Sequence, residues 1–237
     1  SALLIGNETL TSQCGQVLLD RGHQIAAVVT RNADVRKWAA SKGLQVESAG
    51  DWTALSNLSV DWLLSVANLT VIPQDILNLA RKGAVNFHDG PLPRHAGLNA
   101  PVWAILAGEA QHGITWHLME GGVDEGDILE QRLFDIAPND TALTLNTRCF
   151  EAGMESFPAL VTQLETGLRR AAQDLSLRSI HMAKDRPAAQ GRIDFTQSSE
   201  QVARLVRALD HGRYWNPLTT AKIATATRVL NVGSADL

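Results

Sequence analysis

Short apolar runs alternate with amphipathic stretches over the first half of the chain. Continuous apolar runs, typical of buried strands, cover residues 2–6, 25–30 and 62–66. Between the first two, and again after the second, residues 8–21 and 32–41 carry apolar side chains at helical spacing. This alternation predicts a mostly parallel sheet with helices on both of its faces.

The remaining elements follow from the same criteria. Further strands are predicted at residues 44–47, 84–88, 113–119 and 128–134. Further helices are predicted at residues 74–81, 99–107, 141–164 and 198–209, and a hairpin at 222–232. The predicted fold class is α/β, a doubly wound and mostly parallel sheet with a small C-terminal α+β subdomain.

The chain changes character after the long helix predicted at 141–164. Residues 168–192 are rich in charged side chains, which indicates a connector. The helix and hairpin that follow are short. We therefore expect a main domain at residues 1–175 and a small C-terminal subdomain at 176–237.

Composition and charge exclude several classes of protein. Of the 237 residues, 45% are apolar and 19% are charged, as in an ordinary globular protein. The net charge of −4 predicts no broad basic surface, so we expect no nucleic-acid partner. No apolar run reaches the ~18 residues of a membrane span. No basic leader precedes the short apolar start, so neither a membrane partner nor a signal peptide is expected.

Other negative patterns narrow the chemistry further. Residues 6–8 read Gly-Asn-Glu rather than GxGxxG, and the chain has no GxxxxGK[ST], so neither a dinucleotide cofactor nor ATP is indicated. Cys14 and Cys149 lie outside any CxxC pattern, so we expect buried, reduced thiols in a cytoplasmic protein. His112 and His117 fall on opposite faces of their predicted strand, and we predict no metal site.

Two segments far apart in the sequence carry residues suited to a reaction. Residues 84–97 read AVNFHDGPLPRHAG, and residues 121–129 read GGVDEGDIL. Within a strand, Asn86 and His88 point to the same face, and a turn follows them, as at ligand sites of open α/β sheets. Asp124 lies in a loop between two further predicted strands, from which its carboxylate can reach this pair.

An amide, an imidazole and a carboxylate are suited to acyl transfer to an amine. When an amine attacks a carbonyl carbon, negative charge grows on the oxygen. Asn86 and a protonated His88 can donate hydrogen bonds to that oxygen. Asp124 can hold the imidazolium and help relay the proton that leaves the amine. No Ser or Cys nucleophile is required, so the sequence favours direct transfer.

These residues also carry a resemblance to a known family. The Asn-Xaa-His strand end with its Leu-Pro turn, followed by Val-Asp-Xaa-Gly-Asp, resembles the 10-formyltetrahydrofolate-dependent formyltransferases, and the resemblance covers residues 1–165. That family includes methionyl-tRNA, glycinamide ribonucleotide and sugar-amine formyltransferases. The resemblance implies a Rossmann-like fold, catalytic roles for Asn86, His88 and Asp124, and 10-formyltetrahydrofolate as the formyl donor.

The resemblance also implies where the donor binds. In the family, the loop before the Asn-Xaa-His strand and the loop that carries the aspartate hold the pterin, largely through backbone groups. The corresponding residues of this chain are Leu69, Thr70, Val71 and Ile72 in the first loop, and Glu120, Gly121, Gly122 and Val123 in the second.

The expected acceptor follows from a departure from the usual family motif. Most members carry Pro-Ser-Leu-Leu-Pro or a similar sequence after the histidine, whereas residues 89–93 of this chain read Asp-Gly-Pro-Leu-Pro. That version is similar to the formylation domains that initiate nonribosomal peptide synthetases. It implies an aminoacyl carrier protein with a phosphopantetheine arm as acceptor, and a neighbouring adenylation domain. The alternatives are a nucleotide-sugar amine or methionyl-tRNA formyltransferase and, in another class, an inactive folate-binding module.

Overall fold

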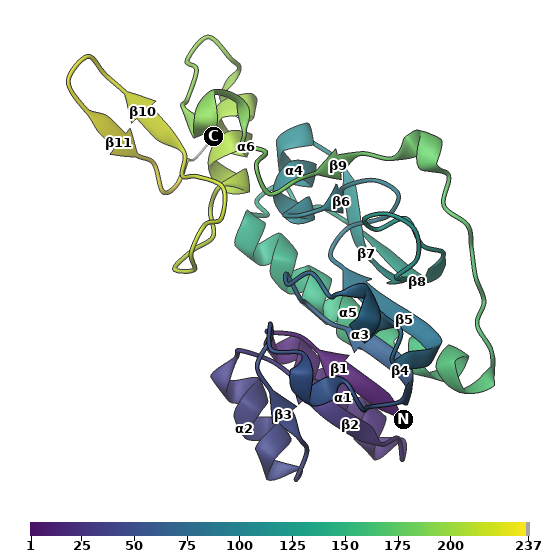
Figure 1. The fold of residues 1–237 in the computed structure, drawn as a ribbon. Helices are drawn as coiled ribbons and strands as arrows, with labels where there is room; N and C mark the ends of the chain where they lie inside the picture. The colour runs from purple at the N-terminus through teal and green to yellow at the C-terminus, as the bar shows by residue number, and fades with distance from the viewer. Residues whose placement is uncertain (236–237) are drawn as a thin grey trace. The chain divides into compact units, whose positions relative to one another are not determined.

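The computed structural model describes residues 1–235, which divide between two compact units (Figure 1). The first unit comprises Ser1–His88, Ile114–Arg132 and Ala152–Gln173, and the second comprises Asp89–Gly113, Leu133–Glu151 and the described residues from Asp174 onward. The expectation of separate domains at 1–175 and 176–237 concerns independent folding, and it stays a prediction. No helix within residues 1–235 is both long and apolar enough to cross a membrane.

A seven-stranded sheet has the strand order β3-β2-β1-β4-β5-β7-β8. Every pair from β3 to β5 is parallel, and β7 is antiparallel to β5. The predicted doubly wound, mostly parallel sheet is therefore confirmed. Its strands are β1 (Ala2–Ile5), β2 (Ile25–Val29), β3 (Val46–Glu47), β4 (Val60–Ser65), β5 (Ala80–His88), β7 (Gln111–Leu118) and β8 (Ile128–Asp135).

The helices and the smaller strand pairs complete the described chain. The helices are α1 (Thr9–Asp20), α2 (Ala33–Ser41), α3 (Gln74–Leu77), α4 (Ala100–Ala107), α5 (Ala142–Thr166) and α6 (Ser199–Ala208). Short 3₁₀ turns lie at Thr53–Leu55, Leu175–Leu177 and Ala188–Gly191. β6 (Ala96–Gly97) pairs with β9 (Ile180–His181), and β10 (Lys222–Ala224) pairs with β11 (Val229–Asn231) as the predicted hairpin.

One predicted helix is wrong over its second half. α3 ends at Leu77 rather than at residue 81, and β5 begins at Ala80. The reason is pairing with β4, because a parallel ladder starts where Val60 meets Ala80 and continues to the pair of Ser65 and Asn86. Neighbouring strands outweigh a local helical preference where they offer such a ladder. The longer strand presents its carboxyl end, residues 86–88, beside β4 and β7.

Apolar side chains cover both faces of the sheet in the first unit. Leu3 and Ile5 of β1 lie in one buried cluster with Ile76 of α3. Leu4 points the other way and lies beside Gly15 of α1. Parallel strands are stable when both faces are covered in this way, which explains their nearly continuous apolar sequences.

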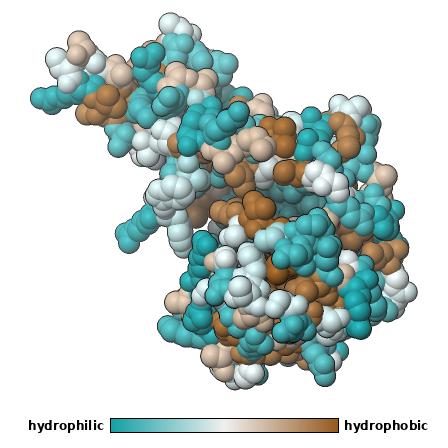
Figure 2. Space-filling view, viewed as in Figure 1, coloured by the Kyte–Doolittle hydropathy of each residue, from teal (hydrophilic) through white to brown (hydrophobic). Residues whose placement is uncertain are grey.

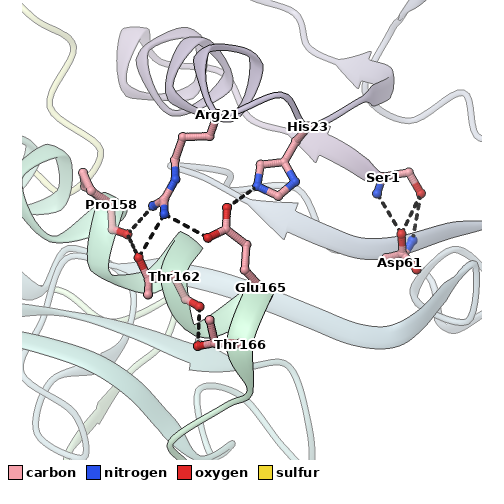
Figure 3. Close-up of polar contacts among 8 residues, drawn as sticks. All are labelled: Ser1, Arg21, His23, Asp61, Pro158, Thr162, Glu165 and Thr166. Atoms are coloured by element: carbon pink, nitrogen blue, oxygen red, sulfur yellow. Dashed lines mark hydrogen bonds and ion pairs between the residues drawn. The ribbon is translucent and has the colours of Figure 1, made fainter.

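The second half of α5 is tied to the end of α1 within the first unit (Figure 3). Arg21 donates hydrogen bonds to Pro158 O at 2.8 Å and to Thr162 Oγ1 at 3.1 Å. The same guanidinium pairs with Glu165 at 2.9 Å, and Glu165 also contacts His23 at 2.8 Å. These contacts link α1 and α5 on one side of the sheet.

Phe87 packs behind the end of β5, on the face opposite the predicted catalytic pair. Its ring centroid lies 5.0 Å from that of Trp116 on β7. The indole of Trp116 donates to Ser156 Oγ of α5 at 2.9 Å. A Cβ at Gly153 would lie 2.7 Å from the Phe87 ring, so a glycine is needed for α5 to come this close to the strand. This packing supports β5 from behind.

The second unit has a core of its own. Val102 and Ile105 of α4, Leu145 of α5, and Val206 and Leu209 from α6 and its end are buried in one cluster. Ser198 caps α6 through a capping box with Gln201, as an N-terminal Ser with Gln three residues later predicts.

The surface mixes apolar and hydrophilic residues, as Figure 2 shows for the visible side. Several apolar side chains are strongly exposed, among them Leu69, Val71, Tyr214, Trp215 and Val229. Leu69 and Val71 belong to the loop predicted to hold the donor.

Candidate active site

Asn86 and His88 end β5 and lie on one face of the strand, as their spacing predicts. His88 is buried, and Asn86 is half-buried. The antiparallel register with β7 places His117 opposite Asn86 and Thr115 opposite His88. Polar side chains from two strands therefore meet at this edge of the sheet.

The loop between β7 and β8 brings Asp124 to the same place. Asp124 Oδ2 lies 3.5 Å from His88 Nδ1, and the Asp124 side chain is only 12% exposed. The backbone of Asp124 has φ 54°, in the left-handed region, which a short polar residue tolerates better than most. The structure thus places the imidazole and the carboxylate within reach of each other.

His117 joins this group, and no sequence motif assigns it a role. Its Nε2 lies 3.2 Å from Asn86 Nδ2 and 3.3 Å from Asp124 Oδ1. Its Nδ1 lies 2.8 Å from Leu118 O, and the residue is 2% exposed. His117 therefore connects the predicted amide with the predicted carboxylate. The register of β5 against β7 reveals this connection, and sequence spacing alone does not.

The partners of His117 fix one of its protons. A carbonyl oxygen only accepts hydrogen bonds, so the Nδ1 that faces Leu118 O carries a proton. In the neutral ring, Nε2 then accepts from the Asn86 amide. When Nε2 is also protonated it donates instead, and the carboxylate of Asp124 is the charged acceptor beside it. The protonation of His117 thus decides which of its two neighbours it binds.

The Asp124 carboxylate lies between two imidazoles. Oδ2 faces His88, and Oδ1 faces His117. The two rings are nearly perpendicular, with centroids 6.5 Å apart. A single carboxylate therefore contacts His88 through one oxygen and His117 through the other.

The first predicted donor loop combines exposed apolar side chains with a backbone fixed from within. Leu69 and Val71 are 85% and 88% exposed, while Ile72 is buried in the core of the first unit. The Asn68 side chain bonds to both N and O of Thr70, at 3.0 and 2.8 Å. Ile72 can therefore contribute only its backbone, whereas the apolar side chains of Leu69 and Val71 are free to contact a ring.

The second predicted donor loop is equally open. Residues 120–123 are all exposed, with Val123 at 50%. The Gly122 N–H donates to Glu125 Oε2 at 2.9 Å, which orders the turn before Asp124. The assignment of Glu120, Gly121, Gly122 and Val123 stays a prediction.

Metal and thiol chemistry have no support in the part of the chain that the structure describes. Within residues 1–235, no three or more His, Cys, Asp or Glu side chains are grouped so that they could hold a metal ion. Cys14 and Cys149 are free and buried. Burial raises the pKa of both thiols well above its usual range, which makes them poor nucleophiles.

Comparison with known sequences identifies the family. Residues 10–161 match the family described as formyl transferase. The chain is 30% identical over 223 residues to the methionyl-tRNA formyltransferase of Idiomarina loihiensis, covering 86% of this chain and 70% of that one. It is 34% identical over 187 residues to the methionyl-tRNA formyltransferase of Anaeromyxobacter sp. strain K, covering 75% and 58%. The chain belongs to the formyl transferase family, and it spans 58% to 70% of the length of these two relatives.

Comparison with solved structures confirms the Rossmann-like formyltransferase fold. A sugar N-formyltransferase from Shewanella sp. FDAARGOS_354 matches with a TM-score of 0.78 at 19% identity, over 100% of this chain and 98% of that one. An N-formyltransferase from Helicobacter canadensis, in complex with folinic acid and dTDP-3-aminofucose, matches with a TM-score of 0.76 at 19% identity, over 87% and 79%. These relatives are named for tRNA and sugar substrates rather than for peptide synthetases.

Proposed function

We propose that this chain transfers a formyl group from 10-formyltetrahydrofolate to a primary amine. The observation that carries this proposal is the grouping of Asn86, His88 and Asp124 at one edge of the sheet, with the carboxylate 3.5 Å from the imidazole. Membership of the formyl transferase family supports the reaction class. The folinic acid in the Helicobacter canadensis enzyme supports a folate as the donor.

Asn86 and His88 stabilise the oxyanion in the proposed reaction. The amine attacks the formyl carbon, and the Asn86 amide and the protonated His88 ring donate to the oxygen as it becomes negative. Removing one such donor costs about 2.7–4 kcal/mol of transition-state stabilisation. Asp124 faces Nδ1 of His88, and in this proposal Nε2 of the same ring is the donor to the oxyanion.

Asp124 also accepts and passes on the proton that the attacking amine must lose. As the new C–N bond forms, the amine nitrogen becomes positively charged and has to lose a proton. The Asp124 carboxylate accepts it and returns it to N10 of the folate as the old C–N bond breaks. The products are a formamide and tetrahydrofolate, so atoms and charges balance without an additional reactant.

The test is turnover with the purified chain, 10-formyltetrahydrofolate and a panel of amines. We expect a formamide by mass spectrometry and an equal amount of tetrahydrofolate. His88→Ala and Asp124→Asn should each lower kcat/KM by at least a hundredfold while folate binding is kept. A wild-type chain that binds folate but formylates no amine of the panel would instead support the inactive folate-binding module.

A sugar amine carried on a nucleotide is the acceptor that the comparisons favour. The sugar N-formyltransferase from Shewanella sp. FDAARGOS_354 aligns with the whole of this chain, including the part after residue 175. If that part contacts the acceptor, a similar C-terminal part supports a similar acceptor class. The longer methionyl-tRNA formyltransferases extend well beyond the matched region, and the net charge of −4 also disfavours tRNA.

An aminoacyl carrier protein is the second acceptor, and it rests on a different observation. Residues 89–93, directly after His88, keep the Asp-Gly-Pro-Leu-Pro sequence that resembles peptide synthetase formylation domains. This acceptor would present its amine on a phosphopantetheine arm, and an adenylation domain would load it.

Competition among acceptors separates these possibilities. A dTDP-amino sugar, an aminoacyl-phosphopantetheinyl carrier protein and methionyl-tRNA are mixed in equal amounts with limiting donor. We expect the formyl group on the amino sugar. Exclusive formylation of the carrier protein would move the acceptor to the peptide synthetase class, and formylation of the tRNA would contradict the argument from charge.

A further inference from the structure

The segment after α5, residues 170–173, binds the loop that carries Asp124. Arg170 links the two ends of this loop, because its Nη2 pairs with Glu120 at 2.6 Å and its Nε pairs with Asp127 at 2.7 Å. The sequence pattern gives no sign of this, since two adjacent arginines at a helix end are common on surfaces. In the structure, Arg170 closes the base of loop 120–127.

The next residue fixes the segment to the sheet. Ala171 and Ile128 exchange backbone hydrogen bonds in both directions, at 2.8 and 2.9 Å, as an isolated antiparallel bridge. Ile128 is the first residue of β8. The segment after α5 is therefore in a fixed register with the end of the Asp124 loop.

Gln173 reaches the Asp124 backbone itself. Its Nε2 donates to Asp124 O at 2.9 Å and to Gly126 O at 2.7 Å. Its Oε1 is buried and has no hydrogen-bond partner within the described residues. The two N–H groups of the Gln173 amide thus make its hydrogen bonds, and both donate to this loop.

The Asp124 backbone needs such support. Asp124 is a non-glycine residue in the left-handed region, a conformation that persists only where its surroundings hold it. Gly126 has no room for a side chain, since a Cβ there would collide with Leu118 O. The Gln173 amide bonds the carbonyls of both residues and so fixes the turn that aims the Asp124 carboxylate.

We propose that Gln173 is a positioning residue for formyl transfer, which it serves by holding Asp124 against His88 and His117. This inference rests on the proposed function. Arg170, Ala171 and Gln173 together form a clasp on the Asp124 loop. Gln173 contacts the aspartate backbone and not the reacting atoms.

Gln163 offers a matched control on α5 in the same unit. Its Nε2 donates to Leu129 O at 2.7 Å, and its Oε1 accepts from the Arg169 N–H at 3.0 Å. It is buried and, like Gln173, donates to a main-chain carbonyl. Its acceptor partner Leu129 lies in β8 and not in the Asp124 loop, and a glutamate keeps an oxygen for the Arg169 N–H, so Gln163→Glu removes a comparable donor without removing a bond to that loop.

The first experiment compares Gln173→Glu, Gln173→Lys and Gln163→Glu by steady-state kinetics. Gln173→Glu keeps the side-chain shape but puts a carboxylate against two carbonyls, and we expect kcat at least tenfold lower. The donor KM should change less than threefold. Gln173→Lys keeps N–H donors at similar reach and should recover kcat to within threefold of the wild type. Gln163→Glu should lower the melting temperature while kcat stays within twofold.

The second experiment is hydrogen–deuterium exchange, which needs no turnover. We expect faster exchange over residues 120–127 in Gln173→Glu and unchanged exchange there in Gln163→Glu. A wild-type chain that formylates no amine would overturn the proposed function. Unchanged exchange in Gln173→Glu would overturn the clasp instead.

The kinetic and folding results for the variants also test the positioning role of Gln173. A kcat for Gln173→Glu within twofold of the wild type, or an equal loss in Gln163→Glu, contradicts a positioning role. If Gln173→Glu does not fold, Gln173→Met removes the donors without adding charge and takes its place. If neither folds while Gln163→Glu does, Gln173 is required for folding and the positioning role is rejected.

Discussion

One carboxylate shared by two imidazoles sets the electrostatics of the candidate site. Asp124 faces His88 with Oδ2 and His117 with Oδ1. If both rings are cationic, the single negative charge is outnumbered in a buried place, which is costly. A protonated His88 is therefore best supported when His117 is neutral and accepts from Asn86. The four side chains are then joined by one hydrogen bond and two imidazole–carboxylate contacts.

Asn86 is predicted to act on the transition state rather than on folding. Asn86→Ala removes one oxyanion donor, so we expect kcat to fall by about 10²–10³-fold. Donor KM should change little, because the charge that Asn86 binds develops only during the reaction. The exposed Asn78 provides a control, since Asn78→Ala should leave kcat unchanged. A similar kcat in both variants would remove Asn86 from the catalytic group.

His117 is predicted to affect kcat through its contacts with Asn86 and Asp124. His117→Phe fills the same space but offers no hydrogen bond, and we expect kcat about tenfold lower. His117→Gln can bond either the amide or the carboxylate and should lose less. Initial rates over pH 6–9 provide the measurement, and the rate difference between the two variants is the decisive quantity. Equal rates for His117→Phe and the wild type would mean that the ring only fills space.

Sequence reasoning identifies Asn86, His88 and Asp124 as candidates, and the structure adds His117, Arg170 and Gln173. The first three lie in short motifs whose residue types suggest the chemistry. The others work through partners that are remote in sequence, as when Gln173 bonds a carbonyl 49 positions away. Such a bond imposes no local spacing, so it leaves no pattern in a single sequence.

Among the elements, β5 depends on close packing behind it. Gly153→Ala would place a Cβ 2.7 Å from the Phe87 ring, and the ring can yield only by shifting against Trp116. We expect a loss of about 1–2 kcal/mol in the free energy of unfolding, since overpacking outweighs the gain in helix propensity. Urea unfolding measures it. Gly233→Ala, where a Cβ meets nothing within 4 Å, is the control. If Gly153→Ala and Gly233→Ala have the same free energy of unfolding, α5 does not pack tightly against Phe87 of β5.

The pairing of β6 with β9 is predicted to weaken in acid. His181 of β9 stacks on Trp103 at 4.4 Å, and burial lowers the pKa of His181 below its usual value. The unfolded chain then binds this proton more readily than the folded one, so stability is present above about pH 6.5 and declines as the pH falls below it. Urea unfolding at pH 7.5 and 5.5 should show a larger acid loss for the wild type than for His181→Gln. If the wild type and His181→Gln lose the same unfolding free energy between pH 7.5 and 5.5, His181 is not the cause of the acid loss.

The elements themselves are largely predictable, and the exceptions have a physical cause. Asn32 caps α2 by accepting from Asp34 N and Val35 N, as its position before the helix predicts. The sequence pattern predicts that the helix continues over residues 78–81, yet β5 begins at Ala80 because β4 pairs with it from there. The decisive partner is a strand 20 positions earlier, and local propensity carries no information about it.

Over the whole molecule, charge is unevenly distributed along the chain. Residues 174–237 contain nine Lys and Arg against six Asp and Glu, whereas residues 1–173 contain 12 against 19. The overall charge of −4 therefore hides a basic C-terminal part. A nucleotide diphosphate and a phosphopantetheine arm carry only a few phosphate charges, so this small basic excess suits either acceptor, whereas a tRNA backbone needs a broad basic surface.

The second unit is predicted to need all three of its segments. Val102 and Ile105 pack with Leu145, Val206 and Leu209, so a chain ending at residue 175 loses part of this core. Fully burying each such side chain is worth about 1.5–3 kcal/mol, and a native protein has only about 5–15 kcal/mol in total. We therefore expect fragment 1–175 to melt at a lower temperature than the full chain and to bind a hydrophobic dye at its incomplete second unit, and we expect residues 176–237, added separately, to raise the melting temperature. A fragment that melts cooperatively at the wild-type temperature would instead make residues 1–175 an independent domain.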